Sequence, residues 1–314
     1  DLWFFDCHFK EDPVMPIIYH HIASLQDTLN LLRSQQRIAL VPTMGNLHAG
    51  HLQLVKMAKQ HADIVVVSIF VNPTQFGIGE DFDSYPRTLE ADVAKLASVD
   101  ADYVFAPSID EMYPQLPPPT KVTAGNIAMQ LCGESRPTHF DGVGIVVAKL
   151  FNIVQPDVAF FGQKDYQQLA IIKQLVRDLS YQIKIIGAPI VRAEDGLALS
   201  SRNQYLTDAE RQTAPVLHEV LEDLAEQLAQ KIAADSFDES VLQSLLTKAA
   251  QRITQAGFEI DYLQVKTTDL QAIDFEAFKL KENQQDLIIL VAATLGQARL
   301  LDNQLVLLNR PLVK

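Results

Sequence analysis

The amino-acid sequence predicts an α/β protein in which a doubly wound, Rossmann-like parallel sheet precedes a smaller α+β C-terminal domain. Two observations predict the parallel sheet. Short β-branched runs alternate with helical windows up to about residue 190, and the run 63–71 is almost continuously apolar, as in a strand covered on both faces. The third observation is a shift to long, charged helical stretches after about residue 191. The length of 314 residues suffices for two domains.

The expected strands of the parallel sheet are the β-branched runs 38–41, 64–71, 103–106, 158–161 and 183–186. The helical windows between them are 24–35, 51–60, 88–98, 142–154 and 166–179. The proline-rich segment 113–120 interrupts this pattern and is expected to be a loop. In a sheet of this kind ligands bind beyond the carboxyl ends of the strands, so the following loops should carry the functional residues.

The second domain is expected to contain two helices and three strand-like runs, at 208–230, 241–256, 262–265, 287–293 and 298–301. We therefore expect a Rossmann-like domain of residues 16–190 and a C-terminal lid domain of residues 191–314. Residues 1–15 contain the chain's single tryptophan and lack the basic region and long apolar core of a signal peptide. They are expected to be an N-terminal extension or a cloning remnant.

Composition and charge argue against several classes of protein. The net charge is −13 and the sequence contains no lysine- or arginine-rich block, so the basic face of a nucleic-acid-binding protein is missing. The two cysteines, Cys7 and Cys132, are too few for a disulfide framework or a zinc site and fit the reducing cytoplasm. The apolar stretches are too short for a transmembrane helix. Local cationic groups and Mg²⁺ must hold any polyphosphate ligand, because the overall field repels it.

The segment 42–51, Pro-Thr-Met-Gly-Asn-Leu-His-Ala-Gly-His, is the strongest functional signal in the sequence. It lies where the strand 38–41 ends and the next helix begins, and a helix N-terminus offers backbone N–H groups and a positive dipole end to an anion. His48 and His51 are three residues apart and can reach the same phosphate, while Gly45 and Gly50 leave room for a nucleotide. The alternative is a surface turn with two solvated histidines.

Two further clusters follow other strands. Asn72 and Gln75 offer neutral donors and acceptors for hydroxyl or carboxylate groups. In the segment 161–168, Lys164 can meet a phosphate as a point charge, Asp165 can cap the next helix, and Gln168 lies one turn further along. The ordinary alternatives are an Asn-Pro turn with a solvated glutamine, and a capped helix with a solvated lysine.

The last two clusters are a serine loop and an acidic helix start. The loop 192–203 ends in Ser200, Ser201 and Arg202, which can donate hydrogen bonds and charge to a triphosphate, although an Asp-Gly turn followed by a serine cap explains the same residues. Asp92 is a candidate ligand for phosphate-bound Mg²⁺, or simply a favourable charge in the first turn of a helix. All five clusters lie at junctions expected to meet in one crevice.

These motifs resemble those of the pantoate–β-alanine ligases (pantothenate synthetases), a family of the HxGH nucleotidylyltransferase superfamily. The resemblance runs from about residue 17 to residue 303 and rests on PTMGNLHAGH, SIFVNPTQF, YPRTLEAD, SRPTHFDGV, KLFNIVQPD, FGQKDYQQL and EDGLALSSRNQYLT. It implies an enzyme of pantothenate and coenzyme A biosynthesis that adenylates (R)-pantoate with ATP and transfers the pantoyl group to β-alanine. It also implies Mg²⁺ as a cofactor, a cytoplasmic homodimer formed largely through the nucleotide-binding domain, and a C-terminal domain that closes over the site.

The resemblance also implies roles for individual residues. His51 is the implied proton donor, and His48, Lys164 and Arg202 are the other implied catalytic groups. The implied ATP-binding residues are Met44, Gly45, Asn46, Leu47, His48, Ala49, Gly50, His51, Gly162, Gln163, Lys164, Asp165, Val191, Leu199, Ser200, Ser201 and Arg202. Gln75, Gln168 and Asn72 are implied to hold pantoate, with Gln75 also contacting β-alanine. Asp92 is implied to reach Mg²⁺ directly or through water.

Two positions depart from the family pattern, and two other functions stay open. Gln163 replaces a glutamate found in many relatives, which makes the site less negative, and Leu199 replaces a methionine found in some. The other functions are a different nucleotidylyltransferase or class I aminoacyl-tRNA synthetase fragment, and a nucleotide-binding sensor without catalysis. The acidic charge disfavours the synthetase, and the presence of both histidines with Lys164 and Arg202 disfavours the sensor.

Overall fold

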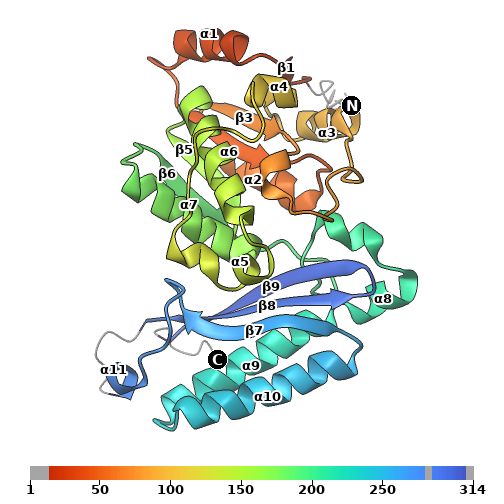
Figure 1. Ribbon diagram of the computed structural model, residues 1–314, viewed down its shortest axis with the longest axis vertical. Coiled ribbons are helices and arrows are strands. Elements are labelled where there is room, and N and C mark those ends of the chain that lie inside the picture. The colour runs from red at the N-terminus through yellow and green to blue at the C-terminus, as the bar shows by residue number, and fades with distance from the viewer. Residues whose placement is uncertain (1–13, 280–284, 309–314) are drawn as a thin grey trace, which may run out of the picture.

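The structure is a computed structural model that describes residues 14–279 and 285–308 (Figure 1). Of the predicted N-terminal extension, residues 1–13 lie outside the described residues. The N-terminal part contains a parallel six-stranded sheet in the order β1-β4-β3-β2-β5-β6. Its strands are β1 (Ile17–Tyr19), β2 (Ile38–Thr43), β3 (Ile64–Ile69), β4 (Tyr103–Phe105), β5 (Val158–Gly162) and β6 (Lys184–Ala188).

Helices cover both faces of this sheet, which confirms the predicted doubly wound α/β class. The helices are α1 (Ile22–Leu32), α2 (Ala49–Lys59), α3 (Leu89–Ala97), α4 (Ile109–Met112), α5 (Cys132–Ser135), α6 (His139–Val154) and α7 (Tyr166–Asp178). Ile38 and Leu40 of β2 pack with α1, α6 and α7, whereas Ala39 and Val41 pack with α2 and α3. Burial on both faces explains why these strands read as continuous apolar runs.

The structure differs from the expected elements at a few places. The edge strand β1 was not predicted, because its three residues are too few for a periodic signal and Ile17 and Ile18 are exposed. Helix α2 begins at Ala49, two residues earlier than expected, and α6 begins at His139, three residues earlier. The N-cap of α2 is a histidine, which is outside the usual set of capping residues. The start of α6 does carry a capping pattern, Thr138 followed three residues later by Asp141, although the Thr138 side chain makes no cap hydrogen bond.

The C-terminal part combines helices with an antiparallel sheet, as predicted. Its elements are α8 (Asp208–Thr213), α9 (Val216–Ala233), α10 (Glu239–Gln255), β7 (Glu259–Thr267), α11 (Phe275–Lys279), β8 (Leu287–Leu295) and β9 (Ala298–Val306), with sheet order β7-β8-β9. The expected single helix 208–230 is wrong, because the chain forms two helices that meet at Pro215. A proline lacks the N–H for the helical ladder and its ring clashes with the preceding turn.

The antiparallel sheet lies between the N-terminal part and the helices α9 and α10 (Figure 1). Strand β8 is buried on both faces. Ile289 and Val291 belong to the core formed with α9 and α10, whereas Ile288 and Leu290 pack with Leu131 of the N-terminal part. The predicted domain boundary at 190/191 falls in the loop between β6 and the 3₁₀ turn Ser201–Tyr205. Among the described residues, none of the helices combines the length and apolarity that a bilayer crossing requires.

Candidate active site

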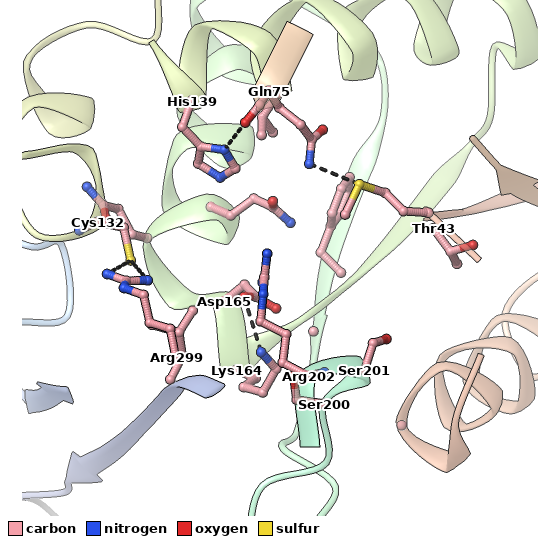
Figure 2. Close-up of a pocket in the computed structure, with 18 of the residues that line it drawn as sticks. Thr43, Gln75, Cys132, His139, Lys164, Asp165, Ser200, Ser201, Arg202 and Arg299 are labelled. Carbon is pink, nitrogen blue, oxygen red and sulfur yellow. Dashed lines mark hydrogen bonds and ion pairs between the residues drawn. The ribbon is translucent and has the colours of Figure 1, made fainter. Parts of the chain in front are cut away.

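A cavity of about 780 Å³ lies at the carboxyl end of the parallel sheet, where the N-terminal part faces strand β9 (Figure 2). The loops after β2, β3 and β5 contribute His48, Gln75 and Lys164, and the C-terminal part contributes Arg202 and Arg299. In Figure 2, Gln75 and His139 lie on one side of this space, and Lys164, Asp165 and Arg202 lie on the opposite side. The position agrees with the rule that ligands bind beyond the carboxyl ends of parallel strands.

The two histidines of the HxGH segment form a reciprocal cap at the start of α2. The Nδ1 atom of His48, the N-cap, accepts a hydrogen bond from the backbone N–H of Gly50 at 3.1 Å. The Nδ1 atom of His51 accepts one from the backbone N–H of His48 at 3.3 Å, and the two ring centroids are 4.1 Å apart. A Cβ on Gly50 would come within 2.8 Å of the His48 ring, so this glycine makes room for the imidazole, and it also lines the cavity.

This cap fixes the chemical state of both imidazoles. Because each Nδ1 accepts a hydrogen bond, the proton of each neutral ring resides on Nε2. Burial, with the positive charge of Lys164, lowers the pKa of His48 to about 4. Burial, with His48 and Lys164, lowers the pKa of His51 to about 3. At neutral pH the cavity is therefore lined by two uncharged imidazoles, each with an Nε2–H that can donate to an anionic ligand.

The turn after β3 is held by a buried amide network. Asn72, which is 1% exposed, donates from Nδ2 to Gln75 Oε1 and to the carbonyl oxygen of Gly142, both at 3.0 Å. Its Oδ1 accepts from the Thr74 hydroxyl at 2.9 Å and from the Tyr113 hydroxyl at 3.0 Å. Asn72 thus lines the cavity while its polar atoms orient Gln75, whose Nε2 donates at 3.1 Å to the weak acceptor Sδ of Met44.

A charged relay supports the same turn, and it was not predicted from the sequence. Glu80 accepts from Arg136 at 2.7 and 2.5 Å, and Arg136 Nη1 lies 3.2 Å from His139 Nε2. His139 Nδ1 lies 2.7 Å from the carbonyl oxygen of Gln75. If Arg136 donates to Nε2, Nδ1 carries the proton and donates to that carbonyl. Arg136 and His139 both belong to the motif SRPTHFDGV, and membership in that motif could have marked them as candidate site residues.

Three depressed histidine pKa values predict acid sensitivity of the fold. Burial, with Arg136, lowers the pKa of His139 to about 4, alongside His48 and His51. These rings titrate near pH 6.5 in the unfolded chain. Between pH 6.5 and 4 the unfolded chain therefore binds more protons, and the free energy of unfolding falls as the pH falls through this window.

The measurement is urea unfolding as a function of pH for wild type and the variant His139→Gln. Removing one of the three groups should reduce the slope of the free energy of unfolding by up to about 1.4 kcal/mol per pH unit. His61→Gln, which replaces an exposed ring, is the control. An unchanged slope in His139→Gln would contradict the expectation.

The turn after β5 places a lysine and an amide toward the cavity. Lys164 Nζ lies 3.3 Å from Asp165 Oδ1. Burial acts to raise the pKa of Asp165, but the charge and hydrogen bond of Lys164 outweigh it, so the pKa is lowered and the carboxylate stays ionised. Asp165 occupies the N-cap position of α7, as the sequence allowed, but its side chain makes no cap hydrogen bond. Gln168 lines the cavity one turn further along.

Two residues near this turn form hydrogen bonds with backbone groups that support it. Gln167, which is 4% exposed, accepts from the backbone N–H of Cys132 and donates to the carbonyl oxygens of Ile127 and Gln130. Asn303 of β9 donates to the carbonyl oxygens of Gln163 and Lys164 at 2.9 and 3.0 Å. The C-terminal sheet thus supports the backbone that presents Lys164.

The serine loop faces the HxGH segment across the cavity. Leu199 N–H donates to the carbonyl oxygen of Val191, and the Ser200 hydroxyl accepts from the N–H of Arg202. The Ser201 hydroxyl donates to the carbonyl oxygen of Asn46 at 3.3 Å, which ties this loop to the HxGH segment. Arg202 Nη2 lies 3.4 Å from Asp81. The four predicted residues of this loop and the preceding Val191 all line the cavity: Val191, Leu199, Ser200, Ser201 and Arg202.

Some predicted site residues point elsewhere. The described lining residues do not include Gly45, Asn46, Leu47, Ala49, Gln163 and Asp92. The Leu47 side chain belongs to the hydrophobic core, and the Gln163 side chain lies against Gly187. Such residues can meet a ligand only through their backbone, so the exchange of glutamate for Gln163 changes little in the cavity.

A direct metal-ligand role for Asp92 is contradicted by its surroundings. Asp92 is fully buried, and its two oxygens accept hydrogen bonds from the backbone N–H groups of Asn46 and Leu47. The carboxylates that do line the cavity each pair with a cation, as Glu80 does with Arg136. Among the described residues no group of three or more histidine, cysteine, aspartate or glutamate side chains could hold a metal ion. The described residues therefore do not fit a dedicated magnesium site.

A cluster from both parts closes the far end of the cavity. The Cys132 thiol lies 3.1 Å from the Tyr262 hydroxyl and 3.6 Å from Arg299 Nη2 (Figure 2). Arg299 also pairs with Asp261. Local sequence gave no signal for this cluster, because β7 and β9 lie more than a hundred residues from Cys132 in the chain.

Comparisons with known proteins agree with this geometry. The family model described as pantoate-beta-alanine ligase matches residues 17–305. The pantothenate synthetase of Psychrobacter cryohalolentis is 70% identical over 296 residues, covering 94% of this chain and 100% of that protein. The crystal structure of pantothenate synthetase from Thermus thermophilus is 39% identical with a TM-score of 0.80, covering 92% of this chain and 98% of that one.

A second solved structure carries ligands. The pantoate-beta-alanine ligase from Francisella tularensis, complexed with beta-gamma ATP and beta-alanine, is 37% identical with a TM-score of 0.74. The alignment covers 92% of this chain and 97% of that one. With nearly full-length matches to the family model, a curated relative and solved structures, this chain belongs to the pantoate–β-alanine ligase family.

Proposed function

We propose that this chain joins (R)-pantoate to β-alanine in two steps at the cavity described above, with ATP as the activating substrate. The observation that carries the proposal is the composition of this one cavity. Two neutral imidazole donors lie with Lys164 and Arg202, and the amides of Gln75 and Gln168 lie beside an apolar wall. That wall consists of Phe70, Phe140, Val143, Val146, Val147, Leu150 and Phe161.

In the first step a carboxylate oxygen of pantoate attacks the α-phosphorus of ATP. The bond from the α-phosphorus to the bridging oxygen breaks, and pyrophosphate leaves with the electron pair. Negative charge grows on the phosphate oxygens, so catalysis depends on positioned donors and cations. The Nε2–H groups of His48 and His51, with Lys164 and Arg202, supply these in a chain whose net charge is −13.

In the second step the neutral amine of β-alanine attacks the acyl carbon of pantoyl adenylate, and AMP leaves with the electron pair of the broken C–O bond. The nitrogen loses one proton as the amide forms, and the departing AMP phosphate takes up that proton. The apolar wall fits the dimethyl carbon of pantoate, and Gln75 and Gln168 fit its hydroxyl and carboxylate groups. Gln75 is also placed to contact β-alanine, since it lines the cavity and its Nε2 donates to Met44 Sδ, a weak acceptor that a ligand can replace.

We propose further that Mg²⁺ enters on the phosphates of ATP, because that ion usually keeps several waters and takes few protein ligands. A homodimer through the N-terminal part is supported by edge strand β1, where Ile17 and Ile18 are 57% and 38% exposed beside the exposed Val14 and Met15. A cytoplasmic location is supported by Cys132, a free thiol.

The decisive test is an omission experiment. The purified chain is incubated with ATP, Mg²⁺, pantoate and β-alanine, and each is left out in turn while AMP and pantothenate are measured. We expect pantothenate only in the complete mixture, and pantoate-dependent exchange of pyrophosphate into ATP without β-alanine. Exchange that depends on an amino acid instead of pantoate would identify a synthetase, and nucleotide binding without exchange would identify a sensor.

The substitution Gln168→Ala should weaken pantoate much more than ATP. Gln168 lines the cavity, whereas its neighbour Gln167 makes three buried hydrogen bonds to backbone groups. We therefore expect Gln168→Ala to raise the KM for pantoate by roughly tenfold or more with little change in the melting temperature. Gln167→Ala, the matched control, should lower the melting temperature. Equal loss of affinity for pantoate and ATP in Gln168→Ala would refute the pantoate role.

A further inference from the structure

The HxGH segment is held from behind by one buried carboxylate. Asp92 Oδ2 accepts from the backbone N–H of Asn46 at 2.8 Å, and Oδ1 accepts from that of Leu47 at 2.7 Å. The Thr88 hydroxyl donates to Oδ2 at 3.0 Å. Asp92 is 0% exposed, and the neighbouring Lys95 donates to the carbonyl oxygen of Leu47 at 2.6 Å. Side chains of helix α3 therefore form hydrogen bonds with three backbone groups of the loop that leads into α2.

These hydrogen bonds act where the loop backbone adopts an unfavourable conformation. Gly45 and Asn46 have φ angles of +82° and +49°, and the left-handed region is unfavourable for a residue with a side chain. Successive backbone N–H groups in such a turn form a concave anion site, which the Asp92 carboxylate fills. A Cβ on Gly45 would lie 3.1 Å from Asp92 Oδ2, so glycine permits the close approach.

The position of the loop sets the position of the phosphate donors. The carboxylate holds the two residues directly before His48, the N-cap whose ring interlocks with that of His51. We propose that Asp92 is a positioning residue for the adenylation step, fixing the HxGH segment so that both Nε2–H groups face the phosphates of ATP. This inference rests on the proposed function and replaces the magnesium role expected from the sequence.

The proposal predicts that the two half-reactions respond differently. Adenylation involves the β- and γ-phosphates of ATP, whereas transfer from pantoyl adenylate to β-alanine does not. A displaced HxGH segment should therefore impair the first half-reaction and spare the second. A general loss of folded protein would lower both half-reactions by the same factor.

The test compares Asp92→Asn with wild type in both half-reactions. Asparagine keeps the size of the side chain but presents an NH₂ group to a backbone N–H, so one hydrogen bond is lost. We expect pantoate-dependent pyrophosphate exchange to fall between about tenfold and a hundredfold, with a raised KM for ATP. Single-turnover transfer from supplied pantoyl adenylate should stay within about twofold of wild type. Glu90→Gln, with the same charge change on an exposed residue of α3, is the control.

Each contrary outcome is distinct. Equal losses in both half-reactions, or Asp92→Asn behaving like Glu90→Gln, would overturn the positioning role. Recovery of exchange at high Mg²⁺ would make Asp92 a metal ligand and also overturn it. If Asp92→Asn does not fold, Thr88→Val replaces it, because this variant removes only the hydroxyl donor to Asp92. Thr88→Val must then lower pyrophosphate exchange, by a smaller factor, while sparing transfer to β-alanine. Equal rates of exchange in Thr88→Val and wild type would contradict the proposal. Failure of the wild-type chain to show any pantoate-dependent exchange would refute the proposed function instead.

Discussion

Replacing Lys164 by methionine is expected to lower pantoate-dependent pyrophosphate exchange about a thousandfold, at the upper end of what loss of one preorganised charge-stabilising group produces. Lys164 lines the cavity beside Asp165, and its charge contributes to keeping His48 and His51 neutral. In a chain with a net charge of −13, such local cations must balance the phosphates. The measurement is the exchange rate at saturating ATP and pantoate.

The matched control for this substitution is Lys173→Met, which removes an exposed lysine from α7, the helix that follows the turn of Lys164. It should leave exchange unchanged. Lys164→Arg should recover only part of the activity, because a planar guanidinium does not place a compact charge at the same point. Exchange within about tenfold of wild type in Lys164→Met would contradict a role in stabilising the transferring phosphate.

Replacing Gly142 by alanine should displace the turn that carries Asn72 and Gln75. A Cβ at this position would lie 2.2 Å from the carbonyl oxygen of Thr74 and 2.6 Å from the Cα of Gln75, and backbone cannot rotate away as a side chain can. We expect a loss of about 2 kcal/mol or more in the free energy of unfolding, as overpacking typically causes. The KM for pantoate should rise by roughly tenfold or more, with a smaller change for ATP.

The control is Gly144→Ala, two residues further along α6. A Cβ there meets Val122 Cγ1 at 3.2 Å, a side-chain atom that can move. Alanine is more favourable than glycine in a helix interior, so Gly144→Ala should be close to neutral or slightly stabilising. Urea unfolding and pantoate titration of both variants decide the matter, and equal behaviour would remove the special role of Gly142.

Local sequence patterns predicted the parallel sheet and the loops that converge on the cavity, because strand ends and helix starts have short-range signatures. They predicted less well where the decisive contact is distant in the chain. Asn303 reaches the turn of Lys164 from about 140 residues away, and no pattern around residue 303 encodes that contact. The inward-facing polar groups of β9 were therefore missed, as was the cluster of Cys132 with Arg299.

The same limit explains the reassignment of Asp92. An acidic residue in the first turn of a helix is equally consistent with a helix-dipole charge, a metal ligand or a buried acceptor. Only the position of α3 against the HxGH loop distinguishes them, since it directs the carboxylate to the N–H groups of Asn46 and Leu47. His48 as a helix cap was missed for a different reason, because histidine is outside the usual set of capping residues.

The burial of β8 on both faces has a consequence for how this protein can be divided. Ile288 and Leu290 need the N-terminal part as a covering surface, and Asn303 of the neighbouring strand holds the backbone of Lys164. A fragment that ends near residue 190 would lose the support of its own lysine turn, and a fragment that begins there would expose an apolar sheet face to water. The two halves are thus not independent modules, and a version split near residue 190 should regain activity only when both halves are brought back together.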